Sequence, residues 1–330
     1  MTRSRLVVVW SSAVVAAGLT AALGALVLDP ARESVGPLPP EGLALLPEAR
    51  FVMGLDVQRF SASPFYKRYG ARGGRPDAFA ELQAKTGIDP ERDVDRVFVA
   101  GGARVGQRGA ALVMGRFDRS RIARAIETEK RGVTWKSLHG ANVYLFGESS
   151  KSPGALAFLD DSSIVLGAQA SVEAAVANHA AGPGPASNGP LVALLRGVRP
   201  GSTFWMVGDR SLLANLPTTL PTGGSGGEAA LSLPTLQTIV VTGDLDPQVS
   251  LSVIGDTVDA AAAKNVADVV RGFVALASLQ ASQRPELARL ASAVSVTTEA
   301  SRVHVDARFP YDLLDALSPS PSAPLPPAAP

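Results

Sequence analysis

The stretch Lys85 to Gly102, KTGIDPERDVDRVFVAGG, is the part of the chain whose residue types are best suited to chemistry. Carboxylates occupy every second position, and a glycine-rich segment follows them; the four acids are Asp89, Glu91, Asp93 and Asp95. Carboxylates at alternate positions can ligate Ca²⁺ in a loop. A calcium loop, however, requires a glycine where this chain has Val94 and a bidentate glutamate where it has Ala100.

We therefore predict that this stretch joins a helix to a strand. Gly87 follows LQAKT and is suited to end a helix, and Asp89-Pro90 is typical of a turn. Arg92 and Arg96 offer local counter-charges to the acids. On this interpretation the carboxylates lie in a solvated loop and bind no metal.

The glycines that follow resemble a phosphate-binding loop only in part. Gly101 and Gly106 have the spacing of a P-loop, but Gln107-Arg108 replace the Lys-Ser/Thr pair that would contact phosphate and magnesium. Gly223 to Gly227 likewise matches G-x-S-x-G, with Ser225 as the nucleophile. That pentapeptide lies in a Pro/Thr/Gly-rich segment, whereas a nucleophile elbow needs a strand before it and a helix after it. Both segments are predicted to be loops.

The histidines and the paired acids supply no further group of catalytic or metal-binding residues. The three histidines, His139, His179 and His304, are predicted in a turn, at a helix end and in a strand, without the close spacing of a metal site. His304 with Asp306, two residues apart on one strand face, is the best of these candidates. The acids Asp160-Asp161, Asp244 and Asp246 are of the type found in turns. We assign no catalytic, cofactor-binding or metal-binding residue and expect no cofactor and no enzymatic activity.

The N-terminus has the features of a membrane-spanning helix. Leu6 to Leu28 is an uncharged run that as a helix would extend about 34 Å, enough to cross a bilayer core of about 30 Å. Arg3 and Arg5 precede it, which favours a cytoplasmic N-terminus and export of the rest. We predict a signal-anchor helix, a single-pass protein of the cytoplasmic membrane and a globular part on the periplasmic side.

Two other interpretations of this run stay open. Ala22 and Gly24 are small residues at a spacing that signal peptidase accepts, so cleavage would release a secreted protein. The run is longer than the ~7–15 apolar residues usual in a signal peptide, which favours retention. A buried core helix would need a polar face, and the run offers only Ser11, Ser12 and Thr20.

Composition excludes several classes of function. With 31 Lys and Arg against 30 Asp and Glu, the formal net charge is +1, which gives no broad positive field, and we expect no nucleic-acid partner. The chain of 330 residues has no cysteine, so it forms no disulfide, thiolate metal site or lipidated N-terminal cysteine. Its length favours two domains of ordinary size.

Periodicity predicts an α+β fold with largely antiparallel sheets in two similar layered domains. The expected organisation is an anchor (1–28), a Pro-rich linker (29–48), a first domain (49–180), a linker (181–190), a second domain (191–317) and a Pro/Ala/Ser tail (318–330). In the first domain we expect strands at 51–55, 94–100, 110–116, 134–138, 142–147, 155–159 and 163–166, and helices at 77–85, 119–130 and 171–179. Asp118 and Ala170-Ser171 are the predicted N-caps.

The second domain is distinguished by a long helix over Thr257 to Gln280. Apolar residues recur there at three- and four-residue steps, which predicts one buried face made of Val258, Ala262, Val266, Val269, Phe273 and Leu276. Pro285 begins a short helix, strands are expected over 293–298 and 302–309, and a last helix begins near Tyr311.

Internal similarity predicts that the two domains arose by duplication. FVMGLDVQRFSASP, from Phe51, matches FWMVGDRSLLANLP, from Phe204, and RVFVAGG, from Arg96, matches TIVVTGD, from Thr238. A third pair, LVMG from Leu112 and SVIG from Ser252, follows in the same order. Two merely similar α+β halves are the alternative.

The anchor together with FVMGLDVQRFSASPF, TGIDPERDVDRV, GRFDRSRIARAI, ALAFLDDSSIVLGAQASVEAAV and AVSVTTEASRVHVDARFPYDLL resembles a set of uncharacterised bacterial envelope proteins, over most of Leu46 to Leu317. The resemblance implies an exported, membrane-anchored α+β protein and carries over no activity. We expect a non-catalytic binding module for a protein, lipid or cell-wall partner. The alternatives are a bitopic component of a secretion or pilus-like machine, self-associating through Thr257 to Gln280, and an envelope hydrolase that uses Ser225 or His304.

Overall fold

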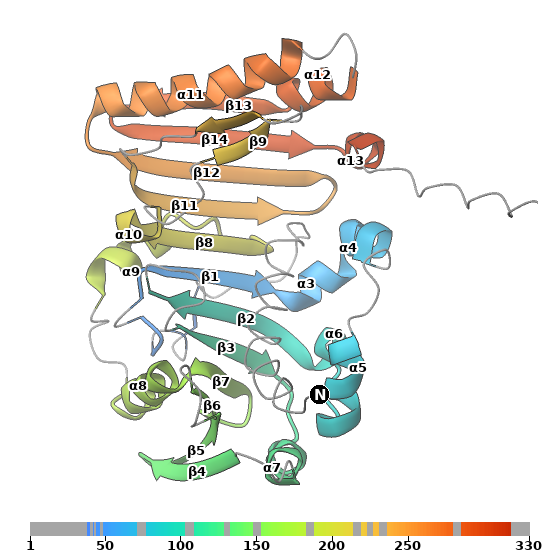
Figure 1. Ribbon diagram of the computed structural model, residues 1–330, viewed down its shortest axis with the longest axis vertical. Helices are drawn as coiled ribbons and strands as arrows, with labels where there is room; N and C mark the ends of the chain where they lie inside the picture. The colour runs from blue at the N-terminus through green and yellow to red at the C-terminus, as the bar shows by residue number, and fades with distance from the viewer. Residues whose placement is uncertain are drawn as a thin grey trace, which may run out of the picture.

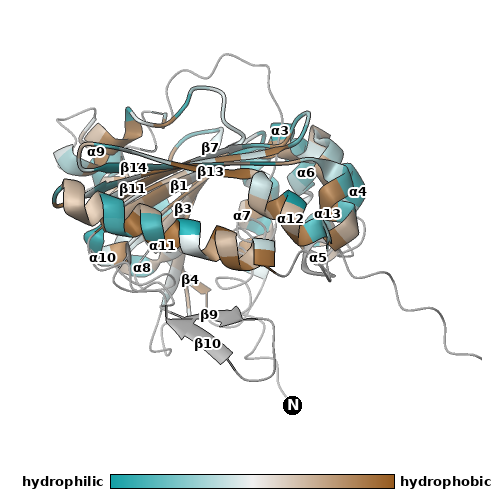
Figure 2. Cartoon of the chain, turned by 90° about the horizontal axis from the view of Figure 1, so that it is seen from above, coloured by the Kyte–Doolittle hydropathy of each residue, from teal (hydrophilic) through white to brown (hydrophobic). Residues whose placement is uncertain are grey.

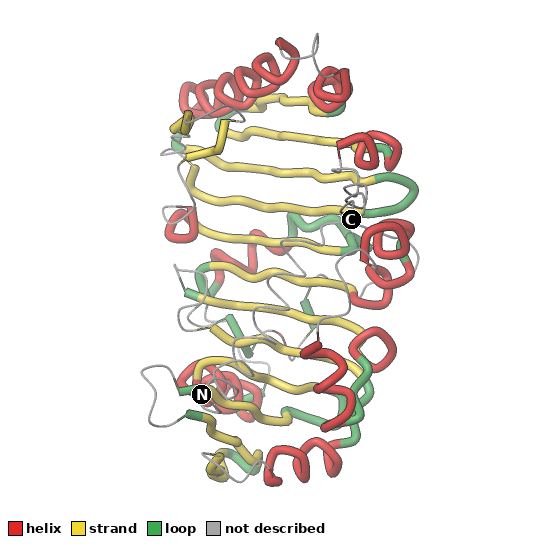
Figure 3. The backbone as a smooth tube through the Cα atoms, turned by 45° about the vertical axis from the view of Figure 1, so that its right-hand side comes forward, coloured by secondary structure: helices red, strands yellow, loops and turns green. Residues whose placement is uncertain are grey.

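The computed structural model is an α+β structure built on one long antiparallel sheet (Figure 1). It describes residues 38–39, 42, 44–46, 49–70, 77–102, 109–128, 133–147, 153–182, 188–213, 219–222, 227–230, 236–279 and 285–317. The predicted α+β class with antiparallel pairing is confirmed. Strands from both predicted halves belong to the same twelve-stranded sheet, which extends along the whole long axis of the molecule (Figure 3).

The chain enters this sheet at its centre. The first strand, β1 (Phe51–Asp56), pairs with β2 on one side and with β8 on the other. On the first side the order continues outward through β2 (Val94–Gly101), β3 (Gly109–Gly115), β7 (Ser163–Ala168), β6 (Gly154–Phe158), β5 (Ala141–Phe146) and β4 (Val133–Leu138). On the second side it continues through β8 (Phe204–Asp209), β11 (Leu236–Asp244), β12 (Val249–Thr257), β14 (Arg302–Phe309) and β13 (Val294–Glu299).

Helices connect and cover these strands. In the first half they are α3 (Val57–Ala62), α4 (Pro64–Tyr69), α5 (Asp77–Thr86), α6 (Pro90–Asp93), α7 (Arg119–Thr128) and α8 (Gln169–Ala180). In the second half they are α9 (Gly189–Leu195), α10 (Arg210–Leu213), α11 (Ala260–Leu279), α12 (Pro285–Ser292) and α13 (Tyr311–Leu317), beside a small hairpin of β9 (Thr219–Thr222) and β10 (Gly227–Ala230).

Each predicted strand and helix named above is present within two or three residues of its expected ends. The N-cap role predicted for Asp118 is confirmed, because its carboxylate accepts a hydrogen bond from the backbone N–H of Arg121. The cap predicted at Ala170-Ser171 is wrong: α8 begins at Gln169, and its N-cap residue, Ala168, makes no side-chain capping bond.

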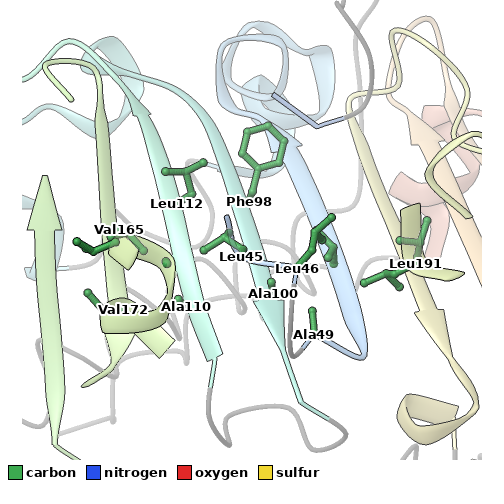
Figure 4. Close-up of a cluster of buried hydrophobic side chains, with 14 of the residues drawn as sticks. Leu45, Leu46, Ala49, Phe98, Ala100, Ala110, Leu112, Val165, Val172 and Leu191 are labelled. Carbon is green, nitrogen blue, oxygen red and sulfur yellow. The ribbon is translucent and has the colours of Figure 1, made fainter. Parts of the chain in front are cut away.

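Alternation along the central strands places apolar side chains on both faces of the sheet. Val52 and Phe98 belong to one buried layer, which α8 and α9 cover. Their neighbours Phe51 and Val99 belong to the opposite layer, which α7 covers through Ile122 and Ile126. In the first layer Leu45 and Leu46, from the segment before β1, also lie against the sheet (Figure 4). Because both faces are covered, the sequences of the central strands are nearly continuous runs of apolar residues.

Glycines at the centre of the sheet make room for aromatic rings. A Cβ added at Gly54 would lie 2.5 Å from Cε2 of Trp205, whose ring lies across that position and near Phe98. Phe204 covers Gly243, where an added Cβ would lie 1.8 Å from the ring. Phe51 covers Gly101 in the same manner, with 2.9 Å from the added Cβ to the ring. These positions need glycine because a ring of the adjacent strand occupies the space above them.

Reciprocal backbone hydrogen bonds close the junction between β1 and β8. The N–H of Asp56 donates to the carbonyl of Thr203, and the N–H of Asp209 donates to the carbonyl of Arg50. Arg50 also donates its N–H to Gly101 on β2, and Thr203 donates its N–H to Gly243 on β11. Each half thus has the same hydrogen-bonded entry into its first strand.

A tyrosine-rich cluster ties α3 and α4 to the second half of the chain. Tyr311, at the start of α13, donates its hydroxyl to the carbonyl of Leu245 and is buried with Phe60. Arg68 lies over the Tyr311 ring, 4.8 Å from its centroid, and Tyr69 donates a hydrogen bond to Asp315. Burial raises the pKa of Tyr311, and the nearby carboxylate of Asp246 adds to this effect.

The long helix α11 only partly confirms the expected buried face. Ala262 is buried and Val266 packs with Leu236 and Val303, but Leu276 is 42% exposed and Val258, which precedes the helix, is 62% exposed. The N-terminal half of α11 therefore packs on the sheet while its last turns do not. Among the residues that the structure describes, no helix is long and apolar enough to span a bilayer. The predicted anchor, Leu6 to Leu28, lies outside them.

Candidate functional site

The acidic stretch is the helix-to-strand join that the sequence predicts. Gly87 ends α5 with a φ of 77°, and its N–H donates to Gln83. Asp89 accepts a hydrogen bond from the N–H of Glu91 at 3.1 Å, while its own N–H donates to the carboxylate of Asp93 at 2.8 Å. These two acids form reciprocal hydrogen bonds that cap the N-terminus of the short helix α6.

The remaining carboxylates of this stretch also have protein partners. Asp93 pairs with Arg92 at 3.0 Å, and the hydrogen bond from that guanidinium lowers the pKa of Asp93. Glu91 accepts a hydrogen bond from the hydroxyl of Tyr66, and Asp95 lies 3.9 Å from Arg116. Each of the four acids therefore has a protein partner, through capping, an ion pair or a tyrosine hydrogen bond.

The other sequence candidates that lie among the described residues do not assemble into a site. In the described part of the chain no group of three His, Asp or Glu side chains is placed to hold a metal. His139 lies in the β4–β5 turn, His179 in the last turn of α8, and His304 on β14. The segment 103–108, which holds Gly106, and the segment 223–226, which holds Ser225, lie outside the described residues.

His304 and Asp306 share one face of β14, as expected, but each faces different neighbours. His304 lies opposite Ile254 on β12 and Thr297 on β13, and its Nε2 is buried without a hydrogen-bond partner. Asp306 lies opposite Ser252 and Ser295. Neither residue has an acid or a histidine directly across the strands; the nearby acid Asp256, whose pKa is lowered in part by the charge of His304, is paired with Arg302.

Asp256 and Arg302 form the main charged pair on β12 and β14, at 2.7 Å. Partial burial opposes ionisation of Asp256, but the hydrogen bonds from Arg302 and Thr238 outweigh it, so its pKa is lowered. Asp160 similarly accepts hydrogen bonds from the backbone and side chain of Ser162 in a turn. Both acids have the low pKa of structural carboxylates, whereas a general acid at neutral pH needs a raised one.

The two edges of the long sheet differ in a way that suggests a binding surface. At one end, α11 lies beside β13, and Arg271 of α11 donates a hydrogen bond to the carbonyl of Val296. The helix thus lies along that edge (Figure 1), and the arginine occupies one of its backbone carbonyls. At the other end is β4, and no other described strand pairs with its outer side (Figure 1).

The outer strand β4 carries an exposed tryptophan. Trp135 lies opposite Tyr144 of β5, yet Trp135 is 60% exposed whereas Tyr144 is only 4% exposed. On the opposite face Lys136 pairs with Glu173 of α8 at 3.0 Å. The buried layer that contains Tyr144 ends at Trp135, and a terminal strand beside exposed aromatic surface is suited to adding another strand.

Sequence reasoning predicted a strand at 134–138 without identifying it as an edge. The available signal was its composition: VTWKSL has only two aliphatic residues, at its two ends. The four residues between them are exposed in the structure. A strand paired and covered on both sides would carry more apolar residues.

A second exposed apolar surface is formed by the last turns of α11. Leu279 is 78% exposed, and Phe273 and Val274 are only partly buried. Figure 2 shows apolar residues along the turns of α11 nearest α12.

Comparisons with protein-family models, curated proteins and solved structures found no match to this chain.

Proposed function

We propose that the chain is a non-catalytic interaction module, held at the outer face of the cytoplasmic membrane, that binds a polypeptide by strand addition to β4. The observation that carries the proposal is the contrast between the two sheet edges. The β13 edge is covered by α11 and Arg271, whereas no strand in the described part of the chain pairs with the outer side of β4, where Trp135 is exposed. Soluble proteins usually protect the edges of their sheets, so a terminal strand with an exposed aromatic side chain is suited to binding.

The membrane location in this proposal rests on Leu6 to Leu28 and the two arginines before it. The short Pro-rich segment 29–48, of which Leu45 and Leu46 already pack against the sheet, would then keep the sheet near the membrane surface. If signal peptidase instead removes the N-terminal run Leu6 to Leu28, the same module is a secreted envelope protein. Carbonate extraction with intact-mass analysis separates these cases, because only an anchored chain stays full length and in the membrane.

We also propose that the sheet arose by duplication. The order β1-β2-β3-β7-β6 outward from the centre is matched by β8-β11-β12-β14-β13 on the other side. The ring of Phe51 over Gly101 corresponds to the ring of Phe204 over Gly243. In this alignment β4 and β5 have no counterpart in the second half. The proposed binding edge is therefore an addition to the repeated unit.

A photo-crosslinking experiment tests the function. A benzophenone amino acid replaces Ser137 on β4 in the full-length chain, expressed in its native envelope. The same amino acid at Leu279 on α11 serves as the matched control. We expect a polypeptide adduct from position 137 that disappears when Trp135 is also changed to Glu. Absence of any adduct at 137 would show that β4 is not a binding edge.

A bitopic assembly component is the second candidate, and the exposed turns of α11 favour it. Leu276 and Leu279 would be buried if α11 packed against another subunit. In the same experiment this candidate predicts an adduct from position 279 that is insensitive to the Trp135→Glu change.

A further inference from the structure

We infer that the seam between β1 and β8 is a twofold pairing surface that accepts the opposite half of this chain and rejects the like half of a second copy. The residues that make this distinction are Gly54 and Trp205. The inference concerns the centre of the sheet and is independent of what binds at β4. It rests on the register of the seam, on its backbone hydrogen bonds and on the unequal side chains beside its axis.

The register of the seam is that of two similar strands related by a twofold axis. The sequence of β1 is FVMGLD and that of β8 is FWMVGD, and their third residues, Met53 and Met206, lie directly opposite each other. The residue before one methionine therefore pairs with the residue after the other, as when a strand pairs antiparallel with its own copy. The two reciprocal backbone hydrogen bonds that close the seam are related by the same axis.

This backbone geometry does not distinguish the two halves of one chain from the same half of two copies. With the axis kept at the methionine, β1 could pair with β1 of a second copy, and β8 with β8, through the same hydrogen bonds. Charge does not prevent such pairing. Arg50, which lies 3.2 Å from Asp209, would have Asp56 of the second copy opposite it instead. Any selection must therefore come from packing.

In the buried layer that α8 and α9 cover, the side chains on the two sides of the axis are unequal. Val52 lies opposite Val207, whereas Gly54 lies opposite Trp205. The Trp205 ring occupies the space above Gly54, where a single added carbon would lie 2.5 Å from Cε2 of the ring. Trp205 is only 6% exposed, so the ring has little other space. The seam therefore needs one strand that supplies the ring and one that supplies the glycine.

Pairing between like halves would break this fit in both combinations. Two copies of β8 would place Trp205 opposite Val207 twice, so each valine side chain would fill the space that the ring takes above a glycine. Two copies of β1 would place Val52 opposite Gly54 twice, which supplies no ring and leaves a void in the buried layer. Of the three combinations, only β1 with β8 combines one ring with one glycine.

Disulfide trapping at the axis distinguishes these pairings, since the chain has no cysteine of its own. The full-length chain is expressed in its native cells and treated with a thiol oxidant. Met206→Cys alone can form a disulfide only with a second copy, whereas Met53→Cys combined with Met206→Cys can link within one chain, because directly opposite residues lie within disulfide reach. We expect the internal link from the double variant and little dimer from the single variant on non-reducing gels.

Trp205→Val should weaken the selection, because two β8 strands would then pair valine with valine in the buried layer. In that background Met206→Cys should give several-fold more disulfide dimer than in the natural sequence. Leu112→Ala opens a cavity in the same layer but outside the seam, so it is the matched control and should leave the dimer yield low. Resistance to limited proteolysis establishes that each variant is folded, and Trp205→Leu, which removes less apolar volume, replaces Trp205→Val if that variant is not.

Three results would overturn the inference. Abundant dimer from Met206→Cys in the otherwise natural chain would show that like halves pair freely. An unchanged dimer yield after substitution of Trp205 would show that the ring does not select the partner. An equal rise with Leu112→Ala would show that lost stability, and not the missing ring, permits like halves to pair. None of these results depends on β4, so the proposed function is tested separately.

Discussion

Substitution of Gly54 by alanine should destabilise the chain through a single steric conflict. The added Cβ would lie 2.5 Å from Cε2 and 2.6 Å from Nε1 of Trp205. Ordinary contacts need about 1 Å more, so the ring must move. Trp205 is only 6% exposed and packs near Phe98, so the ring has little space in which to move.

The expected magnitude combines two opposing effects. Overpacking a well-packed core costs about 1–3 kcal/mol, while replacing a strand glycine by alanine recovers about 0.5–1 kcal/mol of chain entropy. We therefore expect the free energy of unfolding to fall by about 1–2 kcal/mol. Guanidinium titration of the full-length chain, followed by tryptophan fluorescence, measures this loss.

A second glycine supplies the matched control. Gly272 lies inside α11, and an added Cβ there meets nothing within 4 Å. The same change should stabilise the chain by up to about 1 kcal/mol, because alanine is the better helix former. Trp205→Phe combined with Gly54→Ala should cost less than the sum of the two single changes. A neutral Gly54→Ala, or strict additivity with Trp205→Phe, would refute the steric explanation.

Three smaller changes test other parts of the fold. Asp118→Ala removes the N-cap of α7 and should lower the unfolding free energy by about 1 kcal/mol, which thermal denaturation can measure against Asp118→Ser, a variant that keeps a capping oxygen. Tyr311→Phe removes the hydrogen bond to Leu245 and should cost about 1–2 kcal/mol. Since the folded pKa of Tyr311 is raised, its contribution should be full below the unfolded pKa of about 10 and decline as the pH rises above it. The pKa of Asp256 is lowered in the folded chain, so its contribution should be present above about pH 4 and decline as the pH falls further; the stability difference between wild type and Asp256→Asn should therefore be larger at pH 7 than at pH 3.

Local elements were predictable from the sequence because local chemistry determines them. Turn residues such as Gly87, with its positive φ, and caps such as Asp118 act within a few positions of the elements they end or begin. Apolar alternation likewise located each strand named above. The helices α3 and α4 were not predicted, because their stability comes from a tyrosine-rich cluster shared with α13, far along the chain.

The candidate site was not predictable in the same way. Strand order depends on pairings between distant segments, so the pattern of β4 alone could not place it at the end of the sheet. Trp135 reads in sequence as an ordinary strand residue. Only its position opposite the buried Tyr144 shows that an apolar layer stops there. Periodicity shows which side of a helix is apolar, but not how much of the sheet lies beneath that side. The second half of α11 was therefore wrongly predicted to be buried.

The central position of β1 has a consequence for biosynthesis. Its partner β2 follows soon in the sequence, but Leu55 pairs with Phe204 on its other side. While the chain emerges in order, the first half can form its own hairpins and still leave one side of β1 without a neighbour until β8 arrives. Closing such a distant pairing is slow, and an unpaired strand is prone to misassociation. The seam between the halves should therefore form later than the hairpins of the first half, and it should depend most on protection during biosynthesis.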